Sequence, residues 1–90
     1  MNILVISPTY NEKKNISTFI KKIFQLNHSI HLLVVDDNSP DGTADIVKHA
    51  METNDNIHLI VRESKLGLGT AYCRGFEYAL ENGYERIVQM

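Results

Sequence analysis

The sequence lacks the features that define several large classes of protein. Cys73 is the single cysteine among 90 residues, which excludes an internal disulfide and fits a reducing compartment. No apolar run approaches the length of a membrane span. The formal net charge of −2 gives no reason to expect nucleic acid as a partner. The histidines lack the spacing of a metal site, so we expect structural or solvated roles for them: His28, His31, His49 and His58.

Short apolar runs alternate with helical patterns along the whole chain. Runs that are rich in β-branched residues and too short for helices are typical of strands buried on both faces, and they span 3–6, 31–36, 57–61 and 86–90. Apolar residues at helical spacing predict a helix between each pair of strands. Their stripes are Ile16, Phe19, Ile20, Ile23 and Phe24; Ala44, Val47, Ala50 and Met51; and Leu68, Ala71, Tyr72, Gly75, Phe76, Ala79 and Leu80. This βαβαβαβ order predicts a Rossmann-like α/β fold with a parallel sheet and right-handed crossovers.

Particular residues predict where these elements end. Pro8 cannot donate a hydrogen bond to a sheet, so the first strand should stop before it. Asp41 is a good N-cap for the second helix, with Gly42 and Thr43 just inside that helix. Gly83 is a natural residue to follow the third helix.

The third helix carries small residues at regular spacing. They should let it pack closely against the sheet, and they are Ala71, Gly75 and Ala79. Cys73 is expected to be a packing residue beside this stripe.

The strand 31–36 is the centre of the predicted architecture because it delivers two carboxylates, Asp36 and Asp37, to its carboxyl end. Turn residues follow at 38–42. In open α/β sheets, ligands bind at this edge. A ligand role is favoured for Asp37, which should lie beside the loop after the first strand. For Asp36 the alternatives stay open, because it could bind a ligand, face the underside of the sheet or bond to the turn.

The loop after the first strand contains no glycine, which argues against a dinucleotide-binding turn at 8–12. Gly67 and Gly69 follow the third strand instead, and no Walker A pattern is present. What remains is an aromatic face, Tyr10, with the carboxylates Glu12 and Asp37. A nucleobase needs a flat partner and acceptors for its N–H groups, and a ribose needs acceptors for its hydroxyls. These three side chains supply such features.

Three stretches of the sequence stand out together: Pro-Thr-Tyr-Asn-Glu at 8–12, Val-Val-Asp-Asp-Asn-Ser-Pro-Asp-Gly-Thr at 34–43 and Lys-Leu-Gly-Leu-Gly-Thr-Ala-Tyr at 65–72. In order and spacing they resemble the family 2 glycosyltransferases, nearest to the dolichol-phosphate (polyprenol-phosphate) mannosyltransferase branch. The resemblance implies the N-terminal, nucleotide-binding half of a GT-A-type glycosyltransferase fold. In such enzymes the positions that line the nucleotide-sugar pocket match Pro8, Tyr10, Glu12, Val35 and Asp37.

The resemblance also implies a reaction. A sugar, here expected to be mannose, would pass from a nucleoside diphosphate donor such as GDP-mannose to a polyprenyl or dolichyl phosphate. Mg²⁺ or Mn²⁺ would neutralise the leaving diphosphate in the full-length enzyme. The Asp-x-Asp motif that holds this metal is expected just after Met90, so no metal ligand or catalytic residue is expected within the chain. Residues 1–90 would then form a donor-binding part that is truncated before this motif, inactive alone and cytoplasmic, at the cytoplasmic face of a membrane through missing regions or partners.

Other interpretations stay open at this point. The chain could be a non-catalytic nucleotide-binding module with the same half-fold, or a truncated remnant. Arg62 and Lys65 could contact a diphosphate or be solvated loop charges. Gly67 and Gly69 are expected to serve backbone shape and the entry of the third helix.

Overall fold

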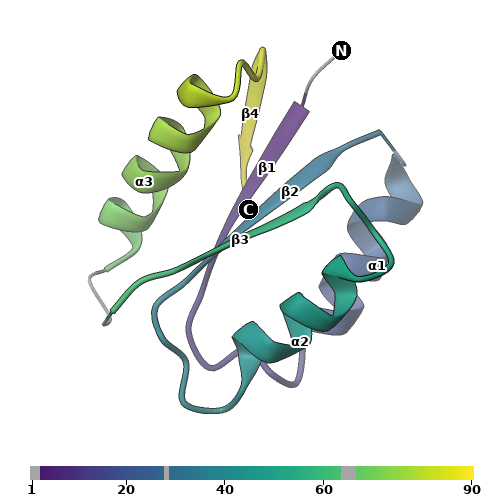
Figure 1. Cartoon of the computed structure of the whole chain (residues 1–90), viewed down its shortest axis with the longest axis vertical. Coiled ribbons are helices and arrows are strands. Elements are labelled where there is room, and N and C mark those ends of the chain that lie inside the picture. The colour runs from purple at the N-terminus through teal and green to yellow at the C-terminus, as the bar shows by residue number, and fades with distance from the viewer. Residues whose placement is uncertain (1–2, 28, 64–66) are drawn as a thin grey trace.

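The computed structural model describes residues 3–27, 29–63 and 67–90, with the backbone alone at position 68. Strands and helices alternate in the predicted βαβαβαβ order. They are β1 Ile3–Thr9, α1 Ile16–Leu26, β2 His31–Asp36, α2 Thr43–Met51, β3 Ile57–Val61, α3 Leu68–Glu81 and β4 Arg86–Gln89. The strands form one parallel sheet in the order β3-β2-β1-β4 (Figure 1), which confirms the predicted α/β fold. No helix of these residues is long and apolar enough to span a bilayer.

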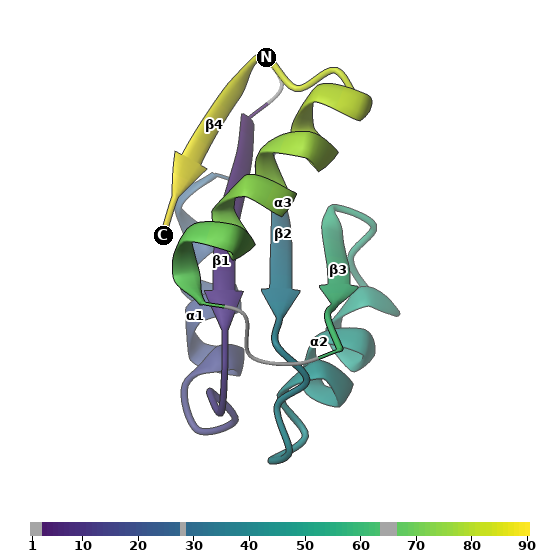
Figure 2. The same ribbon diagram turned by 90° about the vertical axis from the view of Figure 1, so that its left-hand side faces the viewer.

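The helices lie on both faces of the sheet, with α1 and α2 on one face and α3 on the other (Figures 1 and 2). The chain steps from β1 to β2 to β3 in one direction, and then returns past β1 to β4. The helix changes face when the direction of the step reverses, so all three crossovers have the same hand, as the rule for parallel strands requires. The reversal makes the carboxyl ends of β1 and β4 a topological switch point, where α/β sheets bind ligands.

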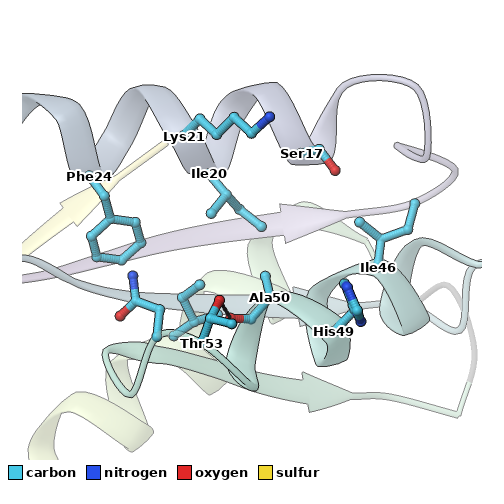
Figure 3. A pocket seen from close by; sticks show the side chains of 10 residues that line it. Ser17, Ile20, Lys21, Phe24, Ile46, His49, Ala50 and Thr53 are labelled. Carbon is cyan, nitrogen blue, oxygen red and sulfur yellow. Dashed lines mark hydrogen bonds between the residues drawn. The ribbon is translucent and has the colours of Figure 1, made fainter.

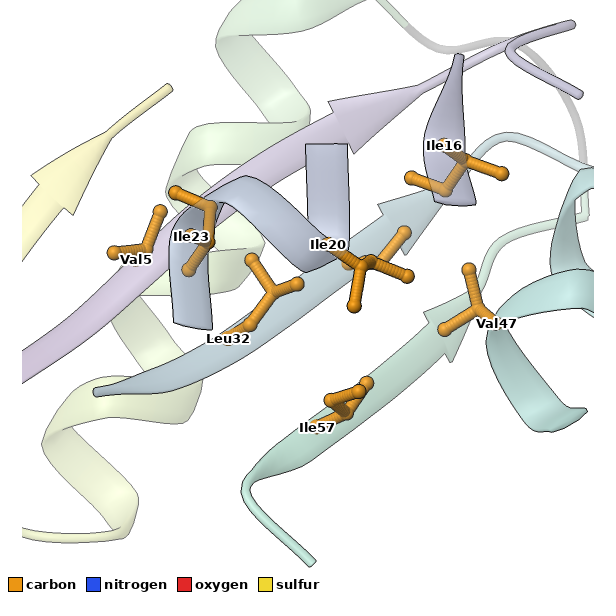
Figure 4. Packing of buried hydrophobic residues seen from close by; sticks show 8 residues of the cluster. Val5, Ile16, Ile20, Ile23, Leu32, Val47 and Ile57 are labelled. Atoms are coloured by element: carbon orange, nitrogen blue, oxygen red, sulfur yellow. The ribbon is translucent and has the colours of Figure 1, made fainter. Parts of the chain in front are cut away.

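Each face of the sheet has its own hydrophobic cluster. The cluster beneath α1 and α2 contains Val5, Ile16, Ile20, Ile23, Leu32, Val34, Val47 and Ile57 (Figure 4). The cluster beneath α3 contains Leu4, Ile6, Leu33, Val35, Ala71 and Ala79. Successive residues of β2 thus enter opposite clusters, which is why this strand reads as a continuous apolar run in the sequence.

The small residues of α3 make the close contact that their spacing predicts. A Cβ atom built on Gly75 would lie 2.6 Å from Cγ2 of Ile6, so only hydrogen fits there. Two predictions for this helix are wrong: that Leu80 belongs to the packed stripe, and that Cys73 is a packing residue beside it. Leu80 is 81% exposed and Cys73 is exposed, because neither lies on the line that faces the sheet. A helix turns by roughly 100° per residue, which rotates both side chains away from that line.

The prediction that β1 ends before Pro8 is wrong, because the strand continues to Thr9. The carbonyl of Ile6 accepts from the N–H of Met90, on the β4 side, whereas the carbonyl of Thr9 accepts from Asp37, on the β2 side. The backbone N–H and C=O groups of successive residues in a strand point to opposite neighbouring strands. The nitrogen of Pro8 therefore points toward β4, like the carbonyl of Ile6. This nitrogen thus points away from β2, and Pro8 removes no hydrogen bond from the pairing of β1 with β2.

Four rings gather at the amino end of the sheet. Nδ1 of His31 lies 3.0 Å from Nε2 of His58, and the Tyr84 hydroxyl lies 2.8 Å from the same Nδ1. The ring of Tyr78 packs against His58. The two histidines therefore have structural roles in joining β2, β3 and the turn before β4.

We predict that Gly75→Ala lowers the free energy of unfolding. The new methyl group would overlap Ile6, which is fully buried and cannot move aside, and overpacking of this kind costs about 1–3 kcal/mol. Urea denaturation measures the change. Gly69→Ala is the matched control in the same helix, since nothing lies within 4 Å of its new Cβ. An equal effect of the two substitutions would contradict the close approach of α3.

We also predict that stability falls as the pH drops below 6.5. Burial lowers the pKa of His58 from its usual 6.5, and the charge of His31 lowers it further. The unfolded chain then binds the proton at higher pH than the folded chain, so the stabilisation is complete above pH 6.5 and is lost as the pH falls through the folded pKa.

Urea denaturation across this pH range measures the loss. It should shrink in His58→Gln and persist in His49→Gln, whose side chain is largely exposed. The same pH dependence in both variants would rule out His58 as its source.

Candidate functional site

The loops after β1 and β2 lie side by side at the carboxyl edge of the sheet (Figure 2). The N–H of Asp37 donates to the carbonyl of Thr9 at 3.0 Å, which extends the pairing of the two strands by one residue. Asn11 and Asn38 both have a φ of 57°, a left-handed conformation that asparagine tolerates better than most residues. Each loop therefore turns sharply soon after its strand ends.

Asp36 holds the base of both loops. Its side chain is fully buried and accepts three hydrogen bonds. The hydroxyl of Thr9 donates to Oδ1 at 2.6 Å, the hydroxyl of Ser39 donates to the same oxygen at 2.6 Å, and the N–H of Ser39 donates to Oδ2 at 2.8 Å. Of the alternatives that the sequence left open, the bond to the turn is the one observed. Asp36 therefore has a structural role.

Side chains of the second loop accept three consecutive N–H groups of the first. The N–H of Asn11 donates to Ser39 Oγ at 2.9 Å, and that of Lys13 donates to Asp41 Oδ2 at 3.0 Å. Between them, the N–H of Glu12 donates to Thr43 Oγ1 at 3.0 Å. The first turn before α1 begins at Glu12, whose carbonyl accepts from residues 15 and 16. The neighbouring loop thus satisfies donors that a helix start leaves without partners, and no side chain caps α1 at Asn15 itself.

The start of α2 differs from the prediction. Gly42, with a φ of 91°, is the N-cap residue, so the helix begins at Thr43 and Asp41 lies one position too early. Asp41 still supports the helix start, because its Oδ1 accepts from the N–H of Thr43 at 3.0 Å and from its hydroxyl at 2.5 Å. The hydrogen bond from the Thr43 hydroxyl lowers the pKa of Asp41 below its usual 3.8, and the N–H of Lys13 contributes to the same shift. Asp41 is therefore placed where it can bond to both loops, the one after β1 through Lys13 and its own through Thr43, and it is not the N-cap of α2.

Asp37 lies beside Asp36 and is 7% exposed. Nε of Arg62 donates to its Oδ1 at 2.5 Å, and both side chains of this ion pair are largely buried. Arg62 is therefore not a solvated loop charge. Lys65, for which the sequence offered the same alternatives, lies outside the described residues, as does Leu66 of the same motif.

The structure brings some of the predicted pocket residues together and separates others. Pro8 and Glu12 line a hollow of about 220 Å³ at the switch point, beside Met90 at the end of β4. Tyr10 is 38% exposed at the start of the same loop, but it does not line this hollow. Asp37 lies on the β2 side, and the side chain of Val35 is fully buried beneath α3. Contact of these residues with a nucleotide stays a prediction.

A larger hollow lies elsewhere and contains none of the predicted pocket residues. It measures about 350 Å³ and runs between α1 and α2, where Ile20, Phe24, Ile46 and Ala50 line it (Figure 3). Its lining is mainly apolar and carries no carboxylate. The hollow at the carboxyl edge is smaller, but it has the position and the polar groups that ligand binding requires.

The part of the chain that the structure describes offers no metal site. Within residues 3–27, 29–63 and 67–90, no group of three or more His, Cys, Asp or Glu side chains could hold a metal ion. These residues therefore do not fit a resident Mg²⁺ or Mn²⁺, and we derive no metal-dependent step for them.

Sequence reasoning missed the roles of Ser39, Thr43 and Arg62. The first two appeared only as a turn residue and the first helical residue of the stretch 38–43. A serine or threonine in a loop does not by itself indicate which group its hydroxyl will bind. The partners of Ser39 and Thr43 lie 28 and 31 residues away in the sequence, and the strand order brings them close.

Comparison with known proteins gives a consistent result. The profile of Glycosyl transferase family 2 matches residues 4–84. The polyprenol monophosphomannose synthase of Mycolicibacterium smegmatis is 43% identical over 88 residues, which cover 97% of this chain and 33% of that protein. The undecaprenyl-phosphate mannosyltransferase of Micrococcus luteus is 39% identical over 90 residues, which cover all of this chain and 37% of that protein.

A solved structure also resembles this fold. It is a mannosyltransferase from Pyrobaculum calidifontis in complex with GDP-Man and Mn²⁺, with a TM-score of 0.79 and 28% identity. The match covers 87% of this chain and 24% of that protein. The chain thus spans about a third of the length of the curated relatives, and the match covers about a quarter of the solved structure.

We predict that Thr43→Val lowers the free energy of unfolding by about 1–3 kcal/mol, because valine fits the buried site of Thr43 but leaves the partly buried N–H of Glu12 without that acceptor. Thr53→Val is the matched control, since that hydroxyl donates an exposed hydrogen bond to the carbonyl of Ala50 in its own turn; we expect a change within about 0.5 kcal/mol. Urea denaturation of both variants measures the difference. Equal values would show that the two loops are not held together through Thr43.

Proposed function

Because the chain belongs to glycosyl transferase family 2, we propose that it is the donor-binding part of an enzyme that transfers mannose from GDP-mannose to a polyprenyl or dolichyl phosphate. Two relatives with mannose-transfer names and a structural neighbour in complex with GDP-Man support this activity. One observation on the chain itself carries the proposal. The two loops that hold Tyr10, Glu12 and Asp37 are locked together at the carboxyl edge of the sheet.

The proposed nucleotide contacts follow from the chemistry of these residues. Tyr10 is exposed enough to stack on a base, and a stacked base gains about 1–3 kcal/mol. Glu12 lines the hollow and would accept from ribose hydroxyls, while Asp37 would accept from the base or the ribose. Pro8 would form one wall of the hollow, and Val35, whose side chain is buried beneath α3, would contribute through its backbone.

The whole reaction is proposed for the full-length protein, because the chain spans about a third of its relatives. A phosphate oxygen of the acceptor would attack the anomeric carbon of the sugar, and the nucleoside diphosphate would leave. Mg²⁺ or Mn²⁺ would neutralise the leaving diphosphate, and we propose that an Asp-x-Asp motif following Met90 holds it. Because the proposed acceptor is a membrane lipid, we also propose that the enzyme acts at a membrane, on its cytoplasmic face.

Calorimetric titration with GDP and UDP, with and without Mn²⁺, tests the donor pocket directly. We expect the chain to bind GDP in preference to UDP with little dependence on Mn²⁺. Tyr10→Ala should weaken this binding by roughly tenfold or more through loss of stacking, whereas Tyr10→Phe should retain it. Circular dichroism of each variant confirms that the fold is intact.

Other results would change the conclusion in defined ways. If the folded chain binds neither nucleotide, the donor-pocket proposal is wrong for this chain. If the chain prefers UDP, the proposed nucleotide pocket stands, but the donor is a UDP-sugar and not GDP-mannose. If the full-length protein binds GDP-mannose yet transfers no mannose to a polyprenyl phosphate, the chain belongs to a nucleotide-binding module instead.

A further inference from the structure

Arg62 follows β3 directly and is fixed at both its backbone and its side chain. Its N–H donates to the carbonyl of Asp36 at 2.7 Å, which continues the pairing of β2 and β3 beyond Val61. Its side chain is 9% exposed and donates from Nε to Asp37 Oδ1. The arginine and the carboxylate therefore meet because the sheet places the ends of neighbouring parallel strands side by side.

The same guanidinium reaches the entry of α3. One terminal nitrogen, Nη1, donates to the hydroxyl of Thr70 at 2.8 Å, and the other, Nη2, donates to the carbonyl of Gly67 at 3.2 Å. The Thr70 hydroxyl donates to that carbonyl as well, at 2.9 Å. The guanidinium contacts these partners through three different nitrogens held in one rigid plane, a geometry that lysine does not offer. Arg62 thus joins the end of β2, the end of β3 and the first turn of α3.

The charges explain why a cation is needed at this point. Asp36 and Asp37 are consecutive and both buried, at 0% and 7% exposure. Neutral donors from Thr9 and Ser39 satisfy Asp36, whereas Asp37 is paired with the charged Arg62. A buried carboxylate that lost its cation would be strongly destabilised beside a second carboxylate. Arg62 therefore compensates the charge of Asp37 and limits its carboxylate to one orientation.

We infer that Arg62 is a positioning residue for nucleotide binding. It holds the Asp37 carboxylate in the orientation that receives the base or ribose, and it connects that carboxylate to the start of α3. This inference rests on the proposed function, in which Asp37 is a nucleotide contact. Arg62 acts through Asp37 and needs no contact of its own with the phosphates.

Titration of GDP and GMP into Arg62→Gln separates this role from a phosphate contact. We expect both affinities to fall by the same factor, roughly tenfold or more, because the two ligands share the base and ribose that Asp37 would meet. A phosphate contact would instead make the loss larger for GDP than for GMP, and that result would overturn the inference. Arg86→Gln, an identical change at the amino end of the sheet, is the control and should leave both affinities unchanged.

A double-mutant cycle tests whether Arg62 acts through Asp37. In the Asp37→Asn background, Arg62→Gln should cause little further loss of GDP affinity, whereas additive losses would overturn the inference. Arg62→Lys keeps a positive charge for Asp37, so it provides the comparison even if Arg62→Gln does not fold. Its loss should be smaller but again equal for GDP and GMP, and unequal losses would count against the inference. If the wild-type chain binds and Arg62→Gln binds equally well, only this inference fails; if the wild-type chain binds no nucleotide, the proposed function fails with it.

Discussion

The structure depends on a buried carboxylate at the end of β2, one of the two inner strands of the sheet. Asp36 has no exposed surface and receives hydrogen bonds from Thr9 on β1 and from both the hydroxyl and the N–H of Ser39 in the following turn. A carboxylate in such a place must be satisfied by the protein, because water cannot reach it. Thr9 and Ser39 must therefore stay within hydrogen-bond distance of Asp36. This requirement fixes where both loops leave the carboxyl edge of the sheet.

Two further layers of contacts extend this constraint outward. Ser39, Asp41 and Thr43 accept the N–H groups of residues 11–13, so the second loop supplies the cap that α1 lacks. On the other side, Arg62 links Asp37 to the entry of α3. The site is thus built from three strand ends that support one another, which suits a pocket that must present an aromatic ring and two carboxylates in fixed positions. Preorganisation of this kind reduces the ordering that ligand binding requires.

Much of the fold could be read from local patterns. The bounds of the strands 31–36 and 57–61 were predicted correctly, as were the helical stripe of Ile16, Ile20 and Ile23 and the close packing of α3 through Gly75. The errors arose where a neighbour decides the outcome. Pro8 lies inside β1 because its nitrogen points away from β2, and Leu80 faces solvent because it lies off the line of small residues with which α3 approaches the sheet.

Local patterns in the sequence predict which segments become strands and helices and which polar residues follow each strand, because hydrophobic periodicity and turn chemistry act over a few neighbouring residues. Contacts between those polar residues, in contrast, depend on the arrangement of the strands in the sheet. Asp37 and Arg62 are 25 residues apart, and Asn11 and Ser39 are 28 apart. Such pairs form only because the strand order β3-β2-β1-β4 sets their loops side by side. The handedness of the crossovers links this strand order to the faces that the helices cover, and no short stretch of sequence specifies either.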